Sequence, residues 1–198
     1  MTTRRATDDH SCTQFVALLR GINVGGNNPV PMADLRDCMA ELGAVHVATY
    51  IQSGNVVFDG VGRDAAAWTT RIEGALSRRF GYDASVALRS HAAMRAVVRD
   101  APMGFGAHPD THRYDALFLK EPLTADEAMG TVKARDGVDI AVAGDGVVYF
   151  ARLEARASQS LLSKIVGTPV YKRMTIRNWR TTMRLLEMLD ERETRPSS

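Results

Sequence analysis

The alternation of apolar and polar positions predicts a strand and then a helix near the start of the chain. Residues 15–20 form an apolar run that ends at Arg20, and a loop rich in glycine and asparagine follows it. Apolar side chains then recur every three or four residues, which predicts an α-helix that Gly43 ends. They are Met32, Leu35, Met39 and Leu42.

A hairpin and a second helix follow. Residues 45–51 are rich in β-branched side chains, and residues 56–58 return as a strand after a polar turn at 52–55. Asp64 is suited to cap the second helix and Gly81 to end it. The apolar face of this helix carries Trp68, Ile72, Leu76 and Phe80. A short strand over residues 85–88 completes the order βαββαβ, which is typical of ferredoxin-like domains.

The same order begins again after a bridging helix and a loop that occupy residues 91–112. Further strands are expected at residues 114–119, 138–142 and 147–151. A capping box at Thr124 opens the helix between the first two of these strands. Glycines at 144 and 146 predict a hairpin turn between the last two.

The last part of the chain lacks a clear final strand. Apolar spacing predicts a short helix over residues 158–166 and a longer C-terminal helix over residues 175–189. Residues 169–171 are the alternative candidate for a strand, suited only to a sheet edge because a proline begins it.

These elements predict an α+β fold of two ferredoxin-like halves, with antiparallel sheets, helices packed on one face of each sheet, and an added C-terminal helix. The expected order is a disordered tail (1–14), the first half (15–90), the bridge (91–112), the second half with its C-terminal helix (113–189) and a mobile tail (190–198). The halves share a pattern of elements rather than visible sequence identity.

Charge and composition exclude several classes of protein. The 25 basic and 23 acidic side chains leave a net charge of +2, which gives no strong overall attraction to nucleic acid or membrane. No apolar run is long enough to span a bilayer, and residues 1–14 lack a signal core, so we expect a cytoplasmic protein. Cys12 and Cys38 are expected to be free thiols. His108 and His112 flank a proline and do not form a helical ligand pair, so we expect no metal and no cofactor.

Two polar loops are the best candidate for a ligand site. In the ferredoxin-like order the first strand ends at the same sheet edge as the hairpin turn, so residues 20–28 and 52–55 should converge. Glycine amides, uncharged side chains and one cation suit a phosphate, a carboxylate or a nucleobase. The candidate residues are Arg20, Asn23, Gly25, Gly26, Asn27, Gln52, Ser53 and Asn55. The alternative is that both loops are structural turns, in which glycine and asparagine are equally common.

A basic stripe on the expected C-terminal helix is a second candidate surface. Arginines spaced by four, three and four residues would share one helix face. Together with the lysine before them they are Lys172, Arg173, Arg177, Arg180 and Arg184. Such a stripe favours a polyanion, an acidic partner surface or an anionic ligand held between domains, and the alternative is a solvated face neutralised by acids elsewhere.

Three motifs resemble an uncharacterised bacterial family, the domain of unknown function 1697. They are Leu-Leu-Arg-Gly-Ile-Asn-Val-Gly-Gly at 18–26, Tyr-Ile-Gln-Ser-Gly-Asn-Val-Val-Phe at 50–58 and Thr-Ile-Arg-Asn-Trp at 175–179. The resemblance covers residues 15–189 and implies two ferredoxin-like parts, with no established activity. Family members often carry a lysine after the double glycine, where this chain has Asn27 and Asn28, and a small polar residue where it has Arg180.

The sequence leaves three functions open. The first is binding of a small phosphorylated or carboxylated ligand at residues 20–28 and 52–55, by a binding protein or an enzyme. The second is nucleic-acid binding through the basic stripe, although the first strand lacks the aromatic pattern of RNA-recognition folds. The third is protein interaction or self-association through an open sheet edge. The oligomeric state is left open.

Overall fold

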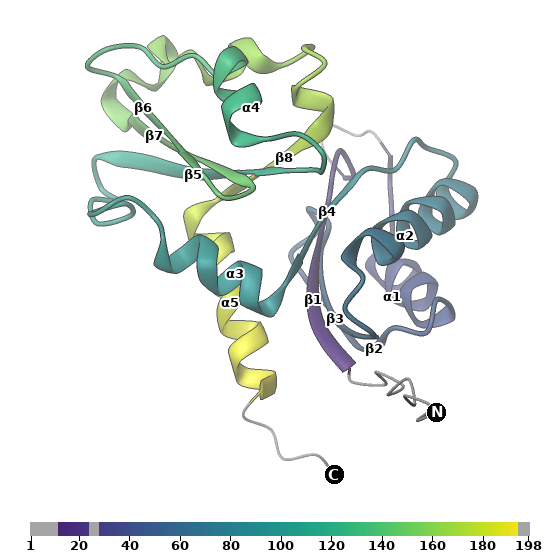
Figure 1. Ribbon diagram of the computed structural model, residues 1–198. Coiled ribbons are helices and arrows are strands. Elements are labelled where there is room, and N and C mark those ends of the chain that lie inside the picture. Colours follow the sequence, from purple (N-terminus) through teal and green to yellow (C-terminus); the bar gives the residue numbers. More distant parts are fainter. Residues whose placement is uncertain (1–11, 24–27, 194–198) are drawn as a thin grey trace, which may run out of the picture.

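Two four-stranded antiparallel sheets, one from each half of the chain, build the molecule (Figure 1). The computed structural model describes residues 12–23 and 28–193 of the 198-residue chain. The strand order is β2-β3-β1-β4 in the first sheet and β6-β7-β5-β8 in the second. Because both sheets have the same order, the predicted α+β fold of two ferredoxin-like halves is confirmed.

The first half follows the predicted order closely. Its elements are β1 (Cys12–Leu19), α1 (Met32–Glu41), β2 (Val45–Tyr50), β3 (Asn55–Val61), α2 (Ala65–Phe80) and β4 (Val86–Ser90). β1 begins at Cys12, inside the stretch predicted to be a tail. The Asp64 side chain accepts a hydrogen bond from the Ala67 amide at 2.9 Å, so it caps α2 as predicted, and Gly81 ends α2 at a φ of 70°.

The second half repeats this order but lacks a counterpart of α2. Its elements are β5 (His112–Leu119), α4 (Ala125–Thr131), β6 (Asp139–Gly144), β7 (Val147–Leu153), β8 (Met174–Asn178) and α5 (Trp179–Glu193). Three short 3-10 turns replace the missing helix: η1 (Glu154–Gln159), η2 (Leu162–Ile165) and η3 (Tyr171–Arg173). The predicted helix over residues 158–166 is therefore wrong. Since η1 buries none of its side chains, it has no apolar face to hold a full helix against the sheet.

The final strand, β8, lies where we predicted the start of the C-terminal helix. Met174 and Ile176 face the outer core of the second half, whereas Thr175 and Arg177 face the other half, which is the period of a strand. The Asn178 side chain then accepts from the Thr181 amide at 2.7 Å and starts α5 without a break. The alternative strand at 169–171 is also wrong, and α5 extends through residues 190–193 of the predicted tail.

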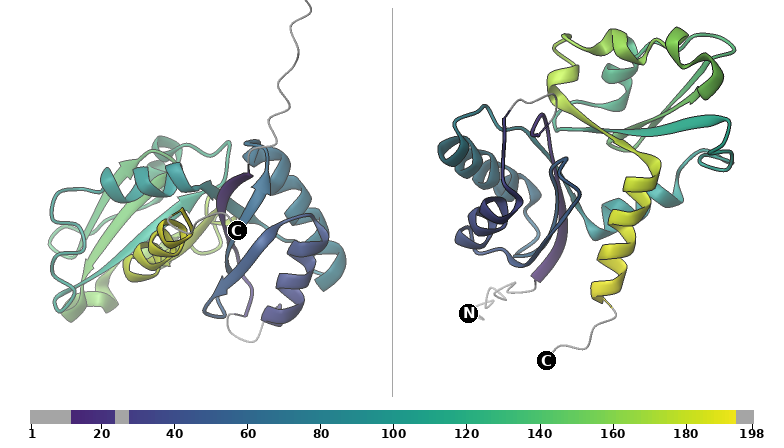
Figure 2. Two further views of the ribbon diagram at one scale, coloured as in Figure 1. Left: turned by 90° about the horizontal axis from the view of Figure 1, so that it is seen from below. Right: turned by 180° about the vertical axis from the view of Figure 1, so that it is seen from behind.

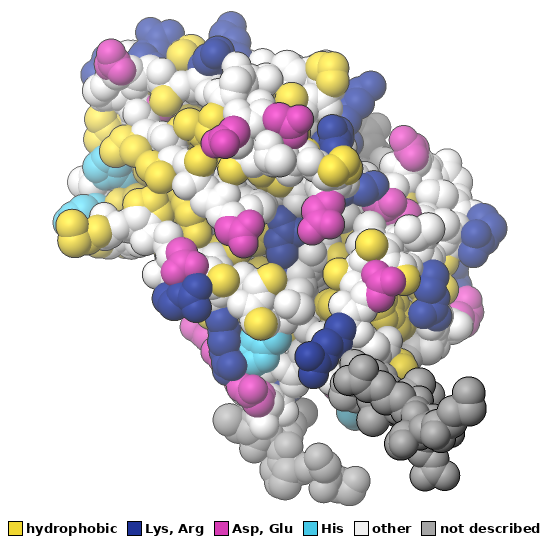
Figure 3. Space-filling view, in the orientation of Figure 1, with side chains coloured by type: hydrophobic (Ala, Val, Ile, Leu, Met, Phe, Trp, Pro, Cys, Tyr) yellow, Lys and Arg dark blue, Asp and Glu magenta, His cyan; other side chains and the backbone are white. Residues whose placement is uncertain are grey.

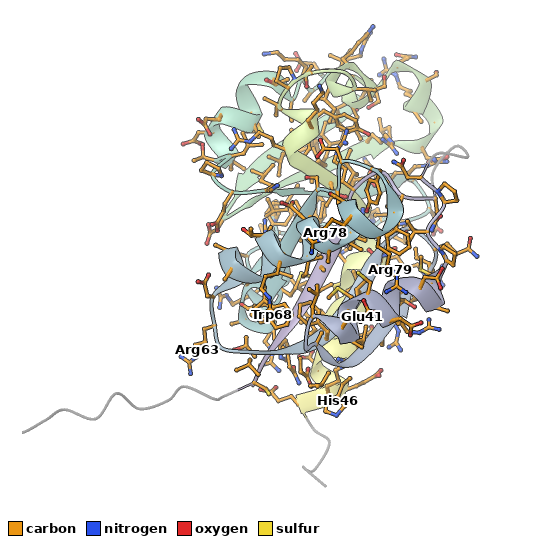
Figure 4. The ribbon with its side chains drawn as sticks, turned by 90° about the vertical axis from the view of Figure 1, so that its right-hand side faces the viewer. Glu41, His46, Arg63, Trp68, Arg78 and Arg79 are labelled. Carbon is orange, nitrogen blue, oxygen red and sulfur yellow. The ribbon has the colours of Figure 1, made fainter. Side chains whose placement is uncertain are left out.

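Helices cover the outer face of each sheet and fill the space between the sheets (Figures 1 and 2). α1 and α2 cover the first sheet, and α4 with the 3-10 turns covers the second. On the outside, Arg79 of α2 pairs with Glu41 of α1 at 2.8 Å (Figure 4). The inner faces of both sheets share one core with α3 (His91–Arg99) and α5, so the halves form one folding unit rather than two loosely linked ones.

α3 and α5 occupy equivalent places, each following the last strand of its half. Their contact is polar at one end, where His91 Nε2 lies 2.7 Å from Asp190 Oδ1. Arg95 also donates to Asp190 at 2.8 Å and bonds Glu193. His91, Asp190 and Glu193 place three ligand-type atoms within 4.8 Å of one another, but Arg95 already bonds both carboxylates. The cluster is therefore a salt-bridge network that links the two helices.

Each sheet has two edge strands, β2 and β4 in the first half and β6 and β8 in the second. On β6, Ile140 and Val142 are 60% and 38% exposed. Self-association through such an edge stays a prediction. Among the described residues, no helix combines the length and hydrophobicity needed to cross a bilayer.

Two glycine substitutions should change stability in opposite directions. At Gly60, an added Cβ would lie 2.6 Å from the buried Trp68 ring, so we expect Gly60→Ala to lower the free energy of unfolding by about 1–3 kcal/mol. At Gly74, inside α2, an added Cβ meets only the end of the flexible Arg78 side chain. Gly74→Ala should therefore raise the free energy of unfolding by about 0.5–1 kcal/mol. Urea denaturation of both variants measures these changes, and two shifts of the same sign would contradict the packing described.

The helix network should make stability depend on pH. Burial raises the pKa of Asp190, but the hydrogen bonds from His91 and Arg95 outweigh it and hold this pKa below its ordinary value. Asp190 therefore stabilises the fold above its unfolded pKa and loses this effect as pH falls through its folded pKa. We expect Asp190→Asn to destabilise the protein at pH 7 and much less near pH 3, measured by denaturation at each pH. Asp136→Asn, at an exposed position, should show no such dependence.

Candidate functional site

The two predicted polar loops do converge at one edge of the first sheet. The Asn23 side chain donates to Gln52 O and to Val30 O, both at 2.9 Å, and accepts from the Val30 amide at 2.8 Å. Asn28 closes the same loop by donating to Gly21 O at 2.9 Å. Asn23 thus ties the loops together, and its amide group is fully engaged in doing so.

Asn55 is also engaged inside the protein. It is completely buried, and its Nδ2 donates to Tyr50 O at 3.0 Å and Ser53 Oγ at 3.2 Å. Its Oδ1 accepts from Arg177 Nε at 2.5 Å. Gln52 is exposed and Ser53 half-buried, whereas Gly25, Gly26 and Asn27 lie outside the described residues.

Arg177 reaches from β8 of the second half into the first half. Only 8% of the residue is exposed, and its Nη2 donates to the backbone oxygens of Leu19 at 2.7 Å and Ser53 at 3.0 Å. Its Nη1 donates to Thr175 Oγ1 at 2.7 Å. Together with the bond to Asn55, these contacts engage all three guanidinium nitrogens.

The acceptors around Arg177 are all uncharged. Burial lowers the pKa of Arg177 to about 10, which still leaves the guanidinium protonated at neutral pH. Backbone dipoles and amide oxygens therefore stabilise this cation in place of a carboxylate. The contact joins the motif around residue 19, the turn at 53–55 and the motif around residue 177, so these motif residues hold the two halves together.

Glycine is required at the turn that Arg177 contacts. Gly54 has a φ of 75°, and an added Cβ would lie 2.7 Å from Leu19 Cβ. This close approach lets Gly54 O accept from the Leu19 amide at 2.7 Å. The end of β1 and the hairpin turn are thereby held together beneath Arg177.

The internal repeat supplies a matching contact that the sequence analysis missed. Arg89 of β4 reaches into the second half, where its Nη2 donates to Leu119 O and Gly146 O, both at 2.7 Å. Leu119 and Gly146 are the counterparts of Leu19 and Gly54, since the Leu119 amide donates to Gly146 O at 2.9 Å. We call the Arg89 and Arg177 contacts the two arginine clasps.

Strand pairing confirms that the clasps are related by the internal repeat. Arg89 pairs with Val16 on β1, and Arg177 pairs with Ala116 at the same place on β5. Both arginines directly precede the residue that caps the next helix, Ser90 in the first half and Asn178 in the second. This shared position of an arginine before a capping residue is the sequence signal that would have revealed the pair.

Arg20 lies beside the Arg177 clasp, next to the two converged loops. Its guanidinium carbon sits 4.8 Å from the centre of the Tyr171 ring, and its Nε donates to Tyr171 O at 3.2 Å. Tyr171 belongs to η3, which also carries the exposed Lys172 and the half-buried Arg173. The second half thus brings Tyr171 to the loops that the sequence identified, and Lys172 and Arg173 follow Tyr171 in the chain.

The predicted basic stripe is not a helical stripe. Lys172 and Arg173 lie in η3, Arg177 is buried on β8, and only Arg180 and Arg184 lie on α5. The spacing was misleading because a strand and a helix join there without an intervening loop. Arg184 forms ion pairs with Glu187 at 3.1 Å and Glu191 at 2.8 Å.

Removing the Arg177 clasp should destabilise the protein strongly. Arg177→Met leaves several buried oxygens without a donor, and we expect the free energy of unfolding to fall by roughly 3–5 kcal/mol. Urea denaturation measures this loss. The matched variant Arg135→Met removes an exposed arginine from a loop and should change stability by less than about 1 kcal/mol. Equal effects of the two variants would show that the clasp contributes little.

Comparisons with known proteins agree with this architecture. The family model described as "Protein of unknown function (DUF1697)" matches residues 12–149. The solved structure of the conserved bacterial protein SP0830 from Streptococcus pneumoniae is 30% identical, covers 90% of this chain and 99% of that chain, and superposes with a TM-score of 0.80. No curated protein matches the chain. Because the family model spans more than half of its length, the chain belongs to the DUF1697 family.

Proposed function

We propose that the protein binds a small phosphorylated or carboxylated molecule at the edge where the two loops meet η3. We call this surface the cationic edge, and it consists of Arg20, Lys172 and Arg173. The observation that carries the proposal is that the Arg20 guanidinium is held in place but is not neutralised by a described carboxylate. Within the described part of the chain, the Arg20 guanidinium stacks on Tyr171 and pairs with no carboxylate.

The ring of Tyr171 and the backbone bond hold Arg20 in one orientation. Only Nε is used in that bond, and neither Nη group has a hydrogen-bond acceptor among residues 12–23 and 28–193, so both are donors for a ligand. A positioned guanidinium loses less entropy when it binds an anion, and it matches the planar geometry of carboxylate and phosphate oxygens. The contact at 4.8 Å therefore favours anion binding as well as stabilising the edge.

The local charge also favours an anion. Lys172 and Arg173 directly follow Tyr171 in sequence, and neither forms an ion pair with any described carboxylate, although Arg173 interacts electrostatically with Glu127. The positive charges of Lys172 and Arg173 lie on the same short segment as Tyr171, and such charges attract an anion. The protein as a whole is nearly neutral, so this concentration of positive charge is a local feature.

Nucleic-acid binding receives less support from the geometry. It was motivated by a basic stripe, but Arg177 is buried and Arg184 is paired with acidic side chains. The positive surface that remains near the cationic edge is short, and it suits a small anion better than a polyanion.

Thermal unfolding in the presence of anions tests the proposal. Inorganic phosphate, AMP, glucose 6-phosphate and citrate are titrated at constant ionic strength, and a ligand at about 100 times its Kd should add roughly 2.7 kcal/mol of stability. We expect at least one of these anions to raise the Tm of the wild type. Arg20→Ala should abolish the increase, because it removes the oriented donors.

Arg135→Ala is the matched control, since it removes one exposed arginine that lies in the second half. It should bind the same anion with unchanged affinity. The proposal fails if none of the four anions raises the Tm, or if the increase survives in Arg20→Ala.

A further inference from the structure

The two arginine clasps differ in how completely they are satisfied. At Arg177, hydrogen bonds engage Nε, Nη1 and Nη2. At Arg89, Nη1 donates to Leu88 O at 2.8 Å and Nη2 to two backbone oxygens, but Nε has no acceptor among the described residues. The Arg89 clasp therefore retains one donor, Nε, without an acceptor in the described part of the chain, and Arg89 is half-buried.

The internal repeat explains the missing acceptor. Asn55, which accepts from Arg177 Nε, pairs with Leu18 on β1. The residue at the same place in the second half pairs with Phe118 and is Val147. An apolar side chain thus stands where the first half supplies an amide oxygen. An acceptor oxygen on a ligand would complete the Arg89 clasp as Asn55 completes the other.

Space for a ligand exists at this clasp. Two cavities of about 240 and 250 Å³ adjoin there and share Ala65, Leu88, Arg89 and Glu121 in their walls. The face seen in Figure 3 is hollowed between the two halves, and basic and acidic side chains meet there. The β6–β7 turn is short, with only Asp145 and Gly146 between the strands, so it does not fill the hollow.

The walls of the cavity carry both signs of charge. Glu121 and Asp145 are exposed at its rim, and both interact electrostatically with Arg89. Neither carboxylate forms an ion pair with a side chain in the described ranges 12–23 and 28–193. A simple anion would be repelled by the two carboxylates, whereas a simple cation would be repelled by Arg89. Arg63, Asp100, Glu73 and Lys120 also line the two cavities, and among these Asp100 pairs with Arg99 and Glu73 pairs with Lys120. A molecule with both charges satisfies Arg89, Glu121 and Asp145 together.

We propose that this hollow, the Arg89 cleft, binds a free α-amino acid between the two halves of the protein. A carboxylate oxygen of the ligand accepts from Arg89 Nε, as Asn55 Oδ1 accepts from Arg177 Nε in the other clasp. The ligand ammonium group donates to Glu121 and Asp145. The cleft is separate from the cationic edge, so this site does not depend on the function proposed above.

NMR spectroscopy of the full-length protein tests the site directly. The standard amino acids are added one at a time, and the Arg89 Nε–H signal is assigned with the conservative variant Arg89→Lys. We expect at least one amino acid to shift this signal in a saturable way. The corresponding carboxylic acid without the amine, and the amine without the carboxylate, should each bind about tenfold more weakly or worse, because each loses one charged contact.

Two sets of variants test the assignment without removing the clasp. The double variant Glu121→Gln and Asp145→Asn changes exposed side chains and should weaken amino-acid binding by about tenfold or more. Val147→Asn should also weaken amino-acid binding, because the new side-chain oxygen would accept from Arg89 Nε and compete with the ligand. Arg20→Ala changes the other site and should leave amino-acid binding unchanged.

Three results would overturn the proposal. The first is an Arg89 Nε–H signal that no amino acid shifts. The second is equal binding of the amino acid and its deaminated acid. The third is unchanged binding in the double variant, which shares the wild-type core and therefore keeps the test independent of any instability in Val147→Asn.

Discussion

A buried cation that no described carboxylate neutralises governs how the two halves of this protein fit together. Arg177 leaves its own sheet and is held by oxygens of β1 and of the 53–55 turn in the other sheet. Moving the halves apart would leave those oxygens and the guanidinium without partners inside an apolar interface. The positions of the loops, of η3 and of Arg20 all follow from this contact, because Tyr171 reaches Arg20 only when β8 lies against the first half.

The repeat gives the molecule two versions of the same contact with different outcomes. In the first version, longer loops and Asn55 surround the arginine, and the contact is purely structural. In the second version, Val147 supplies no acceptor to Arg89 Nε, and Arg89 lines a cavity beside a short turn. All guanidinium nitrogens of Arg177 form hydrogen bonds within the described protein, whereas Nε of Arg89 does not. A polar group without a partner in only one copy of a repeat calls for an explanation other than folding, such as a bound ligand.

Local sequence patterns were sufficient for most of the fold. The caps at Asp64 and Thr124, the hairpins and the convergence of the two loops all depend on neighbouring residues or on the ferredoxin-like order, and these predictions are confirmed. The strand over residues 174–178 was missed because apolar positions continue at helical spacing into α5 with no turn between them. The acceptors of Arg177 and Arg89 could not be predicted, since they lie 122 and 57 residues away in the chain at Asn55 and Gly146, and only the shared position of the two arginines before a capping residue signals the pair.

The reciprocal direction of the clasps has a mechanical consequence. Each half donates an arginine to backbone oxygens of the other half, and α3 and α5 pack in the core between them. A hinge motion that separates the halves would have to break both arginine clasps at once. Proteins that enclose a ligand by domain closure have few contacts between their lobes, whereas the two halves of this protein share an apolar core and two arginine clasps. A molecule entering between the lobes must therefore diffuse into a preformed recess, and its residence time depends on side-chain contacts rather than on closure of the lobes.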